Sequence, residues 1–250
     1  MITNKEIKYL KSLSQKKYRK KYNQFLIEGY RLIKELLESN NEAVKIWVSN
    51  KFLLKHENLS NKIKKYEPII IDSEKFSLTL NTENPQEIMA LLDINKNIEI
   101  DVITKNILIL DGISDPGNLG TILRSAVWYG ITDILLINDC VDLYNPKVVR
   151  SAMGAHYYIR NINFTDIDRI YDALKKKGYS IIGASTTGNS YTKYSINSNK
   201  WALVLGSESH GISKSINNII DVNISIPKKG NIESLNVAIA GSVLLDRLTE

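Results

Sequence analysis

From Asn106 onward the chain alternates short apolar runs with segments of helical periodicity, and this alternation restricts the fold more than any other feature. The expected strands are 106–111, 133–138, 156–160, 179–184 and 201–206. The expected helices are 118–129, 145–153 and 165–177. Alternating strands and helices are typical of a parallel sheet with helices on both faces. We therefore expect an α/β fold in this part of the chain.

A glycine-containing loop, Gly112–Gly117, follows the first expected strand and leads directly into the first expected helix. Asn118 stands at the entrance of this helix, and Arg124 lies on its second turn. In α/β proteins, ligands bind beside the carboxyl ends of strands, where backbone N–H groups and helix N-termini converge. The loop is therefore a candidate site, although an N-capping Asn118 and a solvated Arg124 explain the local sequence equally well.

Two phosphate-binding motifs are excluded at this loop. Gly112 and Gly117 are spaced as in a P-loop, but that motif continues with Lys and Ser or Thr, whereas Asn118 and Leu119 follow here. The glycines at 112, 117 and 120 also do not match the G-x-G-x-x-G fingerprint of dinucleotide-binding proteins. The loop therefore lacks the residues of either nucleotide-binding motif.

Two more polar segments follow buried strands in the last quarter of the chain. The run Leu203–Gly206 is followed by Glu208, a carboxylate that packing seldom requires just after a strand. A strand at Ile224–Pro227 precedes a polar loop and another helix. Ser234 is the predicted N-cap of that helix, and Asn236 falls within its first turn. Ordinary capping also explains each segment when it is taken singly.

The positive charge of the chain is concentrated at its N-terminus. The net charge is +6, but residues 1–22 carry eight basic side chains and one acid, Glu6, for a net charge of +7. The basic residues are Lys5, Lys8, Lys11, Lys16, Lys17, Arg19, Lys20 and Lys21. Such an arm suits a phosphate backbone, and its interleaved tyrosines, Tyr9, Tyr18 and Tyr22, can stack on bases. A solvated helix that keeps the chain soluble is the simpler alternative.

Cysteine, histidine and hydropathy patterns exclude several classes of protein. A single cysteine, Cys140, excludes an internal disulfide. The three histidines, His56, His156 and His210, lack metal-ligand spacing, so no metal site is expected. No apolar run approaches the roughly 18 residues of a membrane span, and no signal-peptide core follows the basic N-terminus. We expect a cytoplasmic protein that does not enter a membrane.

The first part of the chain has the pattern of a small α/β unit. Its expected elements are helices over 5–13, 15–22, 50–65 and 73–80, strands at 44–48 and 68–71, and an apolar run at 88–92. Residues 93–105 mix charges and asparagines without a firm period, so we place the domain boundary near there. The predicted division is a first domain at 1–95, a linker at 96–105 and a second domain at 106–250.

Several motifs together carry a family resemblance. In the second domain they are N-L-G-x-x-x-R (Asn118–Arg124), L-G-S-E-x-x-G (Leu205–Gly211) and I-P-x-x-G-x-x-x-S-L-N-V (Ile226–Val237). In this order they resemble the SpoU/TrmH-type (SPOUT superfamily) RNA ribose 2′-O-methyltransferases. In the first domain, F-L-I-E-G-x-R (Phe25–Arg31) and P-Q-x-I-x-A (Pro85–Ala90) resemble the substrate-binding domain of the two-domain members. The chain departs from the usual Gly, Gly, Met and Ser of these motifs at Glu87, Ser209, Lys228 and Ala238.

This resemblance implies a fold, a cofactor and an assembly. In this family the C-terminal domain is a parallel-sheet trefoil knot that binds S-adenosylmethionine, the N-terminal domain is a small ribosomal-protein-like α/β module that binds RNA, and the enzyme is a homodimer. The implied catalytic residues are Asn118, Arg124, Glu208, Ser234 and Asn236. The implied cofactor-binding residues are Leu205, Gly206, Gly211, Ile226 and Leu235.

The implied reaction is transfer of a methyl group from S-adenosylmethionine to a ribose 2′-hydroxyl, in 23S-type ribosomal RNA by preference. An unactivated hydroxyl is a poor nucleophile, so it needs a base or a cation that stabilises the alkoxide. The family assigns this role to the arginine, Arg124 here. Because a guanidinium is almost never neutral, we expect Arg124 to hold the target phosphate and stabilise the alkoxide. Glu208, Ser234 and Asn236 would orient it.

Other functions stay open at this point. A transfer-RNA ribose methyltransferase and an antibiotic-resistance ribosomal-RNA methyltransferase share the resemblance. An RNA-binding protein with a degenerate enzyme domain is disfavoured because Arg124, Glu208 and Asn236 are all present. An S-adenosylmethionine-dependent enzyme with a non-RNA substrate is disfavoured by the basic arm. The sequence does not identify the RNA or the nucleotide.

Overall fold

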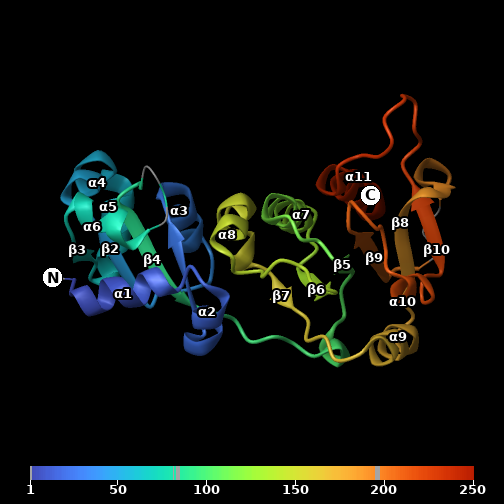
Figure 1. Ribbon diagram of the computed structural model, residues 1–250, viewed down its shortest axis with the longest axis horizontal. Coiled ribbons are helices and arrows are strands. Elements are labelled where there is room, and N and C mark those ends of the chain that lie inside the picture. Colours follow the sequence, from blue (N-terminus) through green and yellow to red (C-terminus); the bar gives the residue numbers. More distant parts are fainter. Residues whose placement is uncertain (1, 81, 83–84, 195–197) are drawn as a thin grey trace. The chain divides into compact units, whose positions relative to one another are not determined.

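The computed structural model describes residues 2–80, 82, 85–194 and 198–250, and the chain forms two compact units (Figure 1). The first unit consists of the chain up to Asn95 together with Asp142–Tyr157. The second consists of Lys96–Val141 and Tyr158–Glu250. Among the described residues, no helix is long and apolar enough to cross a membrane.

The first unit is built on a mixed sheet whose described strands lie in the order β1-β4-β2-β3. Strands β1 and β2 run antiparallel to β4, and β3 runs parallel to β2. The strands are β1 (Gln24–Glu28), β2 (Lys45–Val48), β3 (Ile69–Ile70) and β4 (Ile88–Asp93). The helices are α1 (Asn4–Ser12), α2 (Lys16–Tyr22), α3 (Tyr30–Glu38), α4 (Asn50–Lys55), α5 (Glu57–Ile63), η1 (Lys64–Tyr66), α6 (Ser73–Thr79), α8 (Pro146–Ala152) and η3 (Ala155–Tyr157).

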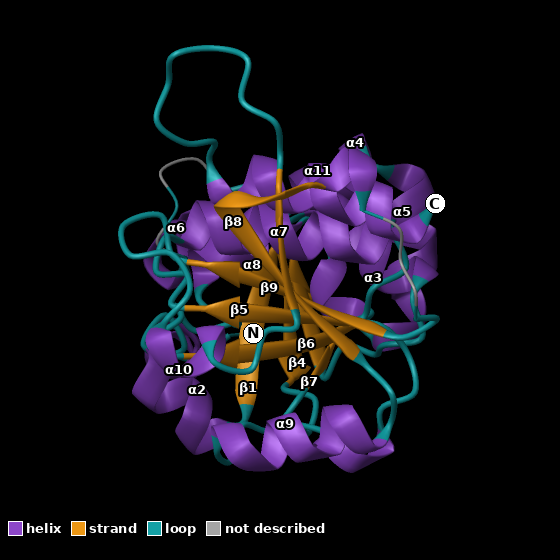
Figure 2. Ribbon diagram, turned by 90° about the vertical axis from the view of Figure 1, so that its right-hand side faces the viewer, coloured by secondary structure: helices purple, strands orange, loops and turns teal. Residues whose placement is uncertain are grey.

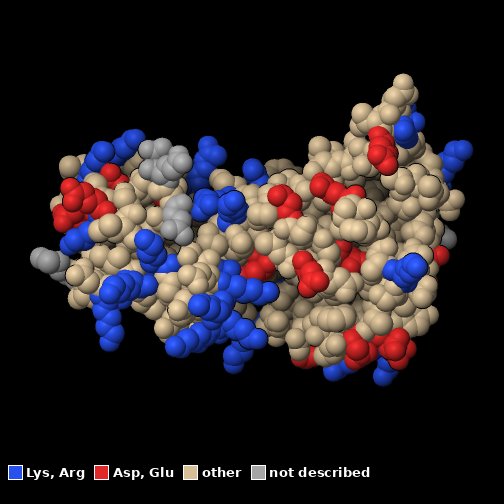
Figure 3. All heavy atoms as spheres, in the orientation of Figure 1, with Lys and Arg blue, Asp and Glu red and all other residues tan. Residues whose placement is uncertain are grey.

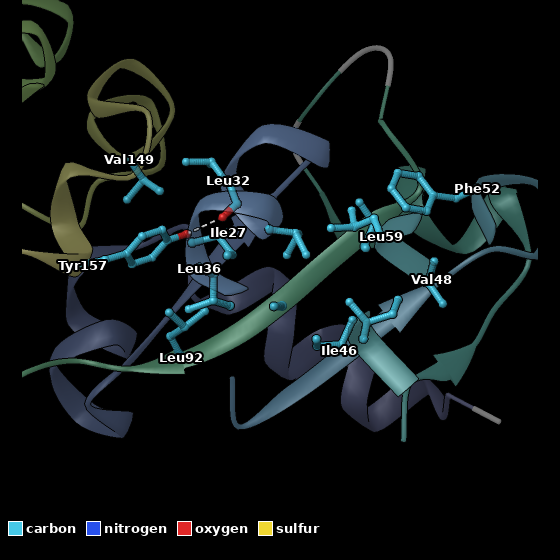
Figure 4. Packing of buried hydrophobic residues seen from close by; sticks show 14 of the residues in the cluster. Ile27, Leu32, Leu36, Ile46, Val48, Phe52, Leu59, Leu92, Val149 and Tyr157 are labelled. Atoms are coloured by element: carbon cyan, nitrogen blue, oxygen red, sulfur yellow. Dashed lines mark hydrogen bonds between the residues drawn. The ribbon is translucent and has the colours of Figure 1, made fainter. Parts of the chain in front are cut away.

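The core of the first unit includes side chains from a segment that is distant in sequence. Leu32 and Leu36 lie four residues apart on one face of α3 and pack in a buried cluster with Val149 and Tyr157 (Figure 4). The Tyr157 hydroxyl also donates a hydrogen bond of 3.0 Å to the carbonyl oxygen of Leu32. Residues 142–157, which follow the βα pattern of the second half of the sequence, therefore pack within the first unit.

The strand expected at 156–160 is wrong. Helix α8 is followed by the helical turn η3, and extended backbone is limited to β7 (Arg160–Asn161). Met153 and Gly154, just before η3, have φ values of +51° and +99°. Two consecutive residues in this region of φ turn the chain sharply, which interrupts the straight approach that a strand requires.

The second unit contains a sheet whose six described strands are all parallel, in the order β10-β8-β9-β5-β6-β7. The remaining strands are β5 (Ile107–Asp111), β6 (Asp133–Ile137), β8 (Ser180–Ser190), β9 (Trp201–Gly206) and β10 (Val222–Ser225). The helices are η2 (Ile100–Val102), α7 (Pro116–Trp128), α9 (Ile167–Lys176), η4 (Tyr191–Lys193), α10 (Lys214–Asn217) and α11 (Val237–Thr249). Apart from β7, the expected βα alternation is confirmed.

Helices cover both faces of this parallel sheet. Figure 2 shows α9 on one side and α7 with α11 on the other. Ile107 and Ile109, on one face of β5, belong to the buried cluster that contains the apolar side chains of α9. On the opposite side α11 lies against α7, where the hydroxyls of Ser125 and Ser242 are 2.7 Å apart. The carboxyl ends of the parallel strands therefore share one edge, from which the motif loops emerge.

Candidate active site

Three of the predicted catalytic side chains lie in one hydrogen-bonded cluster. Asn118 Nδ2 donates to Glu208 Oε1 at 2.9 Å. Asn236 Nδ2 donates to the same Glu208 oxygen at 2.8 Å and to Asn118 Oδ1 at 3.0 Å. We call these three residues the Asn–Glu–Asn triangle. Each comes from a different sequence motif, so the three motifs converge at the carboxyl edge of the sheet.

Asn118, the first residue of the triangle, is positioned by the start of α7. Asp115 is the N-cap of this helix, and its Oδ1 accepts a 2.8 Å hydrogen bond from the backbone N–H of Asn118. The interpretation of Asn118 itself as the N-cap is therefore wrong. Because Asp115 performs the capping, the Asn118 amide group is left to bind Glu208.

Asn236, the third residue of the triangle, is positioned by the start of α11. Asn236 is the N-cap, and its Oδ1 accepts hydrogen bonds from the backbone N–H groups of Ala238 at 3.0 Å and Ile239 at 3.3 Å. With its oxygen held by the helix, its Nδ2 points to the other two corners. The expectation that Ser234 caps this helix is wrong, because the helix begins at Val237. Ser234 is exposed and forms no hydrogen bond with any other described residue.

Arg124 lies on α7 but outside the triangle. It is exposed, and in the part of the chain that the structure describes its side chain forms no hydrogen bond or ion pair. Arg124 is six positions after Asn118, and at 3.6 residues per turn this places the two side chains roughly 120° apart around the helix. The expected contacts that would orient Arg124 through Glu208, Ser234 and Asn236 are therefore not present in this structure.

The loop after β9 depends on a close approach of two backbone segments at Gly206. A Cβ atom at Gly206 would lie 2.2 Å from the carbonyl carbon of Gly211 and 2.3 Å from the nitrogen of Ile212. Ser207 and Gly211 exchange two backbone hydrogen bonds of 3.0 and 2.9 Å, and Gly211 has a φ of +66°. These glycines hold a narrow loop that presents Glu208 to the triangle. Leu205, one residue before, is buried and packs against α11.

The other predicted cofactor residues border the loop between β10 and α11, which extends away from the sheet in Figure 1. Ile226 follows directly after β10, and Leu235 near the end of the loop is 42% exposed. Within the described structure, the backbone N–H groups of residues 228–235 donate no hydrogen bond to the protein. Because Asn236 touches Glu208, this loop and the Gly206–Gly211 loop meet. Free backbone donors and acceptors beside a glycine loop fit an adenosyl and amino-acid ligand.

A second polar cluster, which the sequence motifs do not indicate, supports the Glu208 loop. Asp111 is buried at the end of β5, and its Oδ1 accepts a 2.7 Å hydrogen bond from Asn138 Nδ2. Its Oδ2 accepts a 2.7 Å hydrogen bond from the backbone N–H of Ser213, just beyond the loop. The signal available in the sequence is an aspartate at the carboxyl end of an otherwise apolar strand.

The N-terminal arm is ordered as α1 and α2, and one of its basic residues is not available to a ligand. The Arg19 side chain is 3% exposed and pairs with Asp142, which belongs to the same unit. Its Nη1 also donates hydrogen bonds of 2.8 Å to the carbonyl oxygens of Leu13 and Ser14. The seven lysines of the arm are exposed, and Figure 3 shows basic side chains gathered over α1 and α2. Arg19 is therefore a structural residue of the arm, and the seven lysines are the cations of the arm that a phosphate backbone could reach.

The chain matches two family models. Residues 105–246 match the SpoU rRNA methylase family, and residues 4–90 match the MRM3-like substrate-binding domain. A Bacillus subtilis protein named 23S rRNA (guanosine(2553)-2′-O)-methyltransferase RlmP is 32% identical over 98% of this chain and 96% of its own length. These relationships extend over both units.

Solved structures share the same fold. One from Porphyromonas gingivalis, assigned to the TrmH family of RNA methyltransferases, has a TM-score of 0.86 and 30% identity over 99% of this chain and 98% of its own. The SpoU methyltransferase AviRb from Streptomyces viridochromogenes, solved with S-adenosylmethionine, has a TM-score of 0.86 at 21% identity, with coverage of 99% and 97%. The expected α/β trefoil-knot fold class is confirmed. The chain belongs to the SpoU rRNA methylase family and is an RNA ribose 2′-O-methyltransferase.

Proposed function

We propose that this protein transfers a methyl group from S-adenosylmethionine to the ribose 2′-hydroxyl of one guanosine in 23S ribosomal RNA. The observation that carries the proposal is the Asn–Glu–Asn triangle, because it joins residues from all three methyltransferase motifs at one sheet edge. The name of the B. subtilis relative supplies the RNA and the base.

The cofactor site is proposed at the two loops that flank the triangle. Leu205, Gly206 and Gly211 would form one wall, and the backbone at Ile226 and Leu235 would bind the polar edges of the ligand. When bound, S-adenosylmethionine supplies a methyl group on a sulfonium, which a ribose 2′-oxygen can attack once its proton is withdrawn. AviRb has been solved with this ligand.

We assign separate roles to the polar side chains. Both amide groups of the triangle donate to Oε1 of Glu208, and among the described residues nothing donates to its Oε2. That oxygen is available to accept the proton of the 2′-hydroxyl. Arg124, which has no acidic partner in the described structure, would stabilise the negative charge that develops on the ribose oxygen and bind the adjacent phosphate. Ser234 is exposed on the loop before Asn236 and would contact the substrate.

Different parts of the chain have different proposed roles. Residues 1–95 would bind the RNA, residues 96–105 would link the domains, and residues 106–250, except for 142–157 that pack within the first unit, would carry out the transfer. The exposed lysines of α1 and α2 provide the positive surface that a phosphate backbone requires (Figure 3). An enzyme that modifies ribosomal RNA in a bacterium would work in the cytoplasm.

We propose that the protein acts as a homodimer. Helices α7 and α11 lie together on one face of the sheet, and each exposes a large apolar side chain. Trp128 is 83% exposed and Ile239 is 55% exposed. Burying such groups between two copies would remove them from water. Light scattering coupled to size-exclusion chromatography should give twice the chain mass, and a Trp128→Lys variant should elute as a monomer.

The proposed reaction is tested by methyl transfer to defined RNAs. Purified enzyme and tritiated S-adenosylmethionine are incubated with unmodified transcripts of 23S rRNA, 16S rRNA and transfer RNA. Label should enter 23S rRNA alone, at a single guanosine whose 3′ linkage becomes resistant to alkaline hydrolysis. Label confined to transfer RNA, or present on a base instead of a ribose, would contradict the proposal.

Arg124 separates catalysis from binding in the same assay. Arg124→Ala should lower methyl transfer by about 100-fold or more, while S-adenosylmethionine affinity measured by calorimetry changes little. Arg124→Lys retains the charge without the planar fork, so it tests whether bidentate phosphate binding is required. Arg169→Ala is the matched control, because this exposed arginine lies on α9, on the other face of the sheet. Normal turnover of Arg124→Ala would disprove the assignment.

A further inference from the structure

The first unit contains an open pocket of about 740 Å³ that is separate from the methyltransferase motifs. It lies where the end of β1, the starts of α3 and α4, the turn before β4 and the exposed side of α8 come together. The side chains that matter to its chemistry are Tyr30, Arg31, Lys51, Lys55, His56 and Arg150. All of them belong to the same compact unit.

The pocket is built by the two sequence patterns of the first domain. The Gln86 side-chain oxygen accepts a 2.9 Å hydrogen bond from the backbone N–H of Tyr30, and the Gln86 N–H donates to Glu28 Oε1 at 3.3 Å. Gly29 has a φ of +97°, and a Cβ there would lie 2.8 Å from Gln86 Oε1. The patterns at 25–31 and 85–90 therefore specify one structure, the floor of this pocket.

The rim of the pocket is positively charged. Arg31, Lys55 and Arg150 are exposed, and none of them forms an ion pair with another residue that the structure describes. Lys51 is the exception, because its Nζ lies 3.6 Å from Glu87 Oε1. Three unpaired cations around one concave site favour a ligand that carries phosphate.

One wall of the pocket is aromatic. The His56 ring contacts two others, with centroid distances of 4.8 Å to Tyr30 and 4.5 Å to Phe52. Phe52 is buried in the core, whereas Tyr30 and His56 are half-buried and line the pocket. Partly exposed rings beside cations are the combination with which proteins bind unpaired bases, because every base has a face that can stack.

We propose that this pocket binds a single unpaired nucleotide of the RNA substrate. Its base stacks against Tyr30 and His56, and its phosphates are bound by Arg31, Lys55 and Arg150. The volume of the pocket is within the range of small-ligand sites. The proposal rests on the proposed function in that RNA is the ligand, but it assigns recognition to a site that takes no part in methyl transfer.

Replacing Glu87 should strengthen RNA binding, whereas replacing a cation of the pocket should weaken it. Glu87 has a φ of +58°, where the related motif usually has glycine, and its carboxylate lines the pocket while accepting a hydrogen bond of 2.5 Å from Ser49 Oγ. That hydrogen bond lowers the pKa of Glu87, so the residue is negative at neutral pH. It repels phosphate and pairs with Lys51. Glu87→Gln removes the charge and frees Lys51, so it should strengthen RNA binding severalfold.

The first experiment asks whether a base is bound. Fluorescence anisotropy of full-length protein is measured with a labelled mixed-sequence hexaribonucleotide and with the same backbone made abasic. The complete oligonucleotide should bind about fivefold or more tightly than the abasic one, as expected for base–aromatic stacking. His56→Ala should abolish most of this difference, whereas Phe164→Ala, which removes an exposed ring of the second unit, should not.

The second experiment asks whether the cations of the rim are used. Lys55→Ala should weaken oligonucleotide binding and reduce the slope of log affinity against log salt by about one. Lys62→Ala is the matched control, because it removes an exposed lysine from α5, outside the pocket. If His56→Ala does not fold, the base-dependence is tested by the complete and abasic oligonucleotides with the wild-type protein, and Glu87→Gln and Lys55→Ala test the charges of the pocket.

Equal binding of the complete and abasic oligonucleotides to the wild-type protein would overturn the proposal and leave only a phosphate site. Equal effects of Lys55→Ala and Lys62→Ala, or no gain from Glu87→Gln, would also contradict it. Failure of the proposed function is seen separately. If the protein shows these binding differences but transfers no methyl group to RNA, the methyltransferase assignment is refuted and the pocket proposal is not.

Discussion

Replacing Arg19 by alanine should destabilise the first unit far more than replacing the adjacent Lys20. Arg19 is buried, its Nε and Nη2 bind Asp142, and its Nη1 binds two carbonyl oxygens. Arg19→Ala leaves the Asp142 carboxylate, whose side chain is 19% exposed, without its cation. Breaking such a pair by removing one partner costs about 3–5 kcal/mol. Lys20 is exposed, and its loss should change stability by less than about 0.5 kcal/mol.

Urea unfolding monitored by circular dichroism measures the difference. With an m-value of about 2 kcal/mol/M, a loss of 4 kcal/mol lowers the midpoint of the first unit by about 2 M. The double variant Arg19→Met/Asp142→Leu should recover much of this loss, because it removes both charges together.

An unfolding midpoint for Arg19→Ala within experimental error of the Lys20→Ala midpoint would refute the reasoning. The same pair of variants separates folding from RNA binding. Lys20→Ala should reduce the salt dependence of RNA affinity, since it removes an exposed cation. Arg19→Ala should affect RNA binding only to the extent that it unfolds the protein.

Three further results are expected. Asn236→Asp retains a side-chain cap for α11 but places a second carboxylate beside Glu208, so methyl transfer should fall while stability changes little. Asn236→Ala removes the cap as well, so it should also lower the free energy of unfolding by about 1 kcal/mol, as read from urea midpoints. Burial lowers the pKa of His156 to about 4, and its Nδ1 has no partner among described residues. The free energy of unfolding should therefore have its full value above pH 6.5 and be lower by about 2 kcal/mol at pH 5. The His156→Leu variant should not show this loss. Asp111→Asn should weaken support of the Glu208 loop and lower methyl transfer.

Much of the second unit was predictable because its signals are local. Strand β5 and helix α7 follow from apolar runs and helical spacing that lie within a few residues of one another. The motifs at Asn118, Glu208 and Asn236 were also recognisable as strand-end or helix-start segments. Their meeting was not derivable from periodicity, because it depends on the strand order β10-β8-β9-β5. This order brings Asn118 into contact with Glu208, which is 90 positions away, and with Asn236, which is 118 positions away.

The sequence by itself determined the alternation of strands and helices, the residues of the motifs and the concentration of charge at the N-terminus. Only the tertiary structure decided which side chains are used. Arg19 and Lys20 are adjacent cations on one short helix, yet one is buried against Asp142 and the other is exposed. Asn236, not Ser234, caps α11, and Arg124 lies outside the triangle. These outcomes depend on contacts between distant segments, and local sequence patterns carry no information about which distant group a side chain will meet.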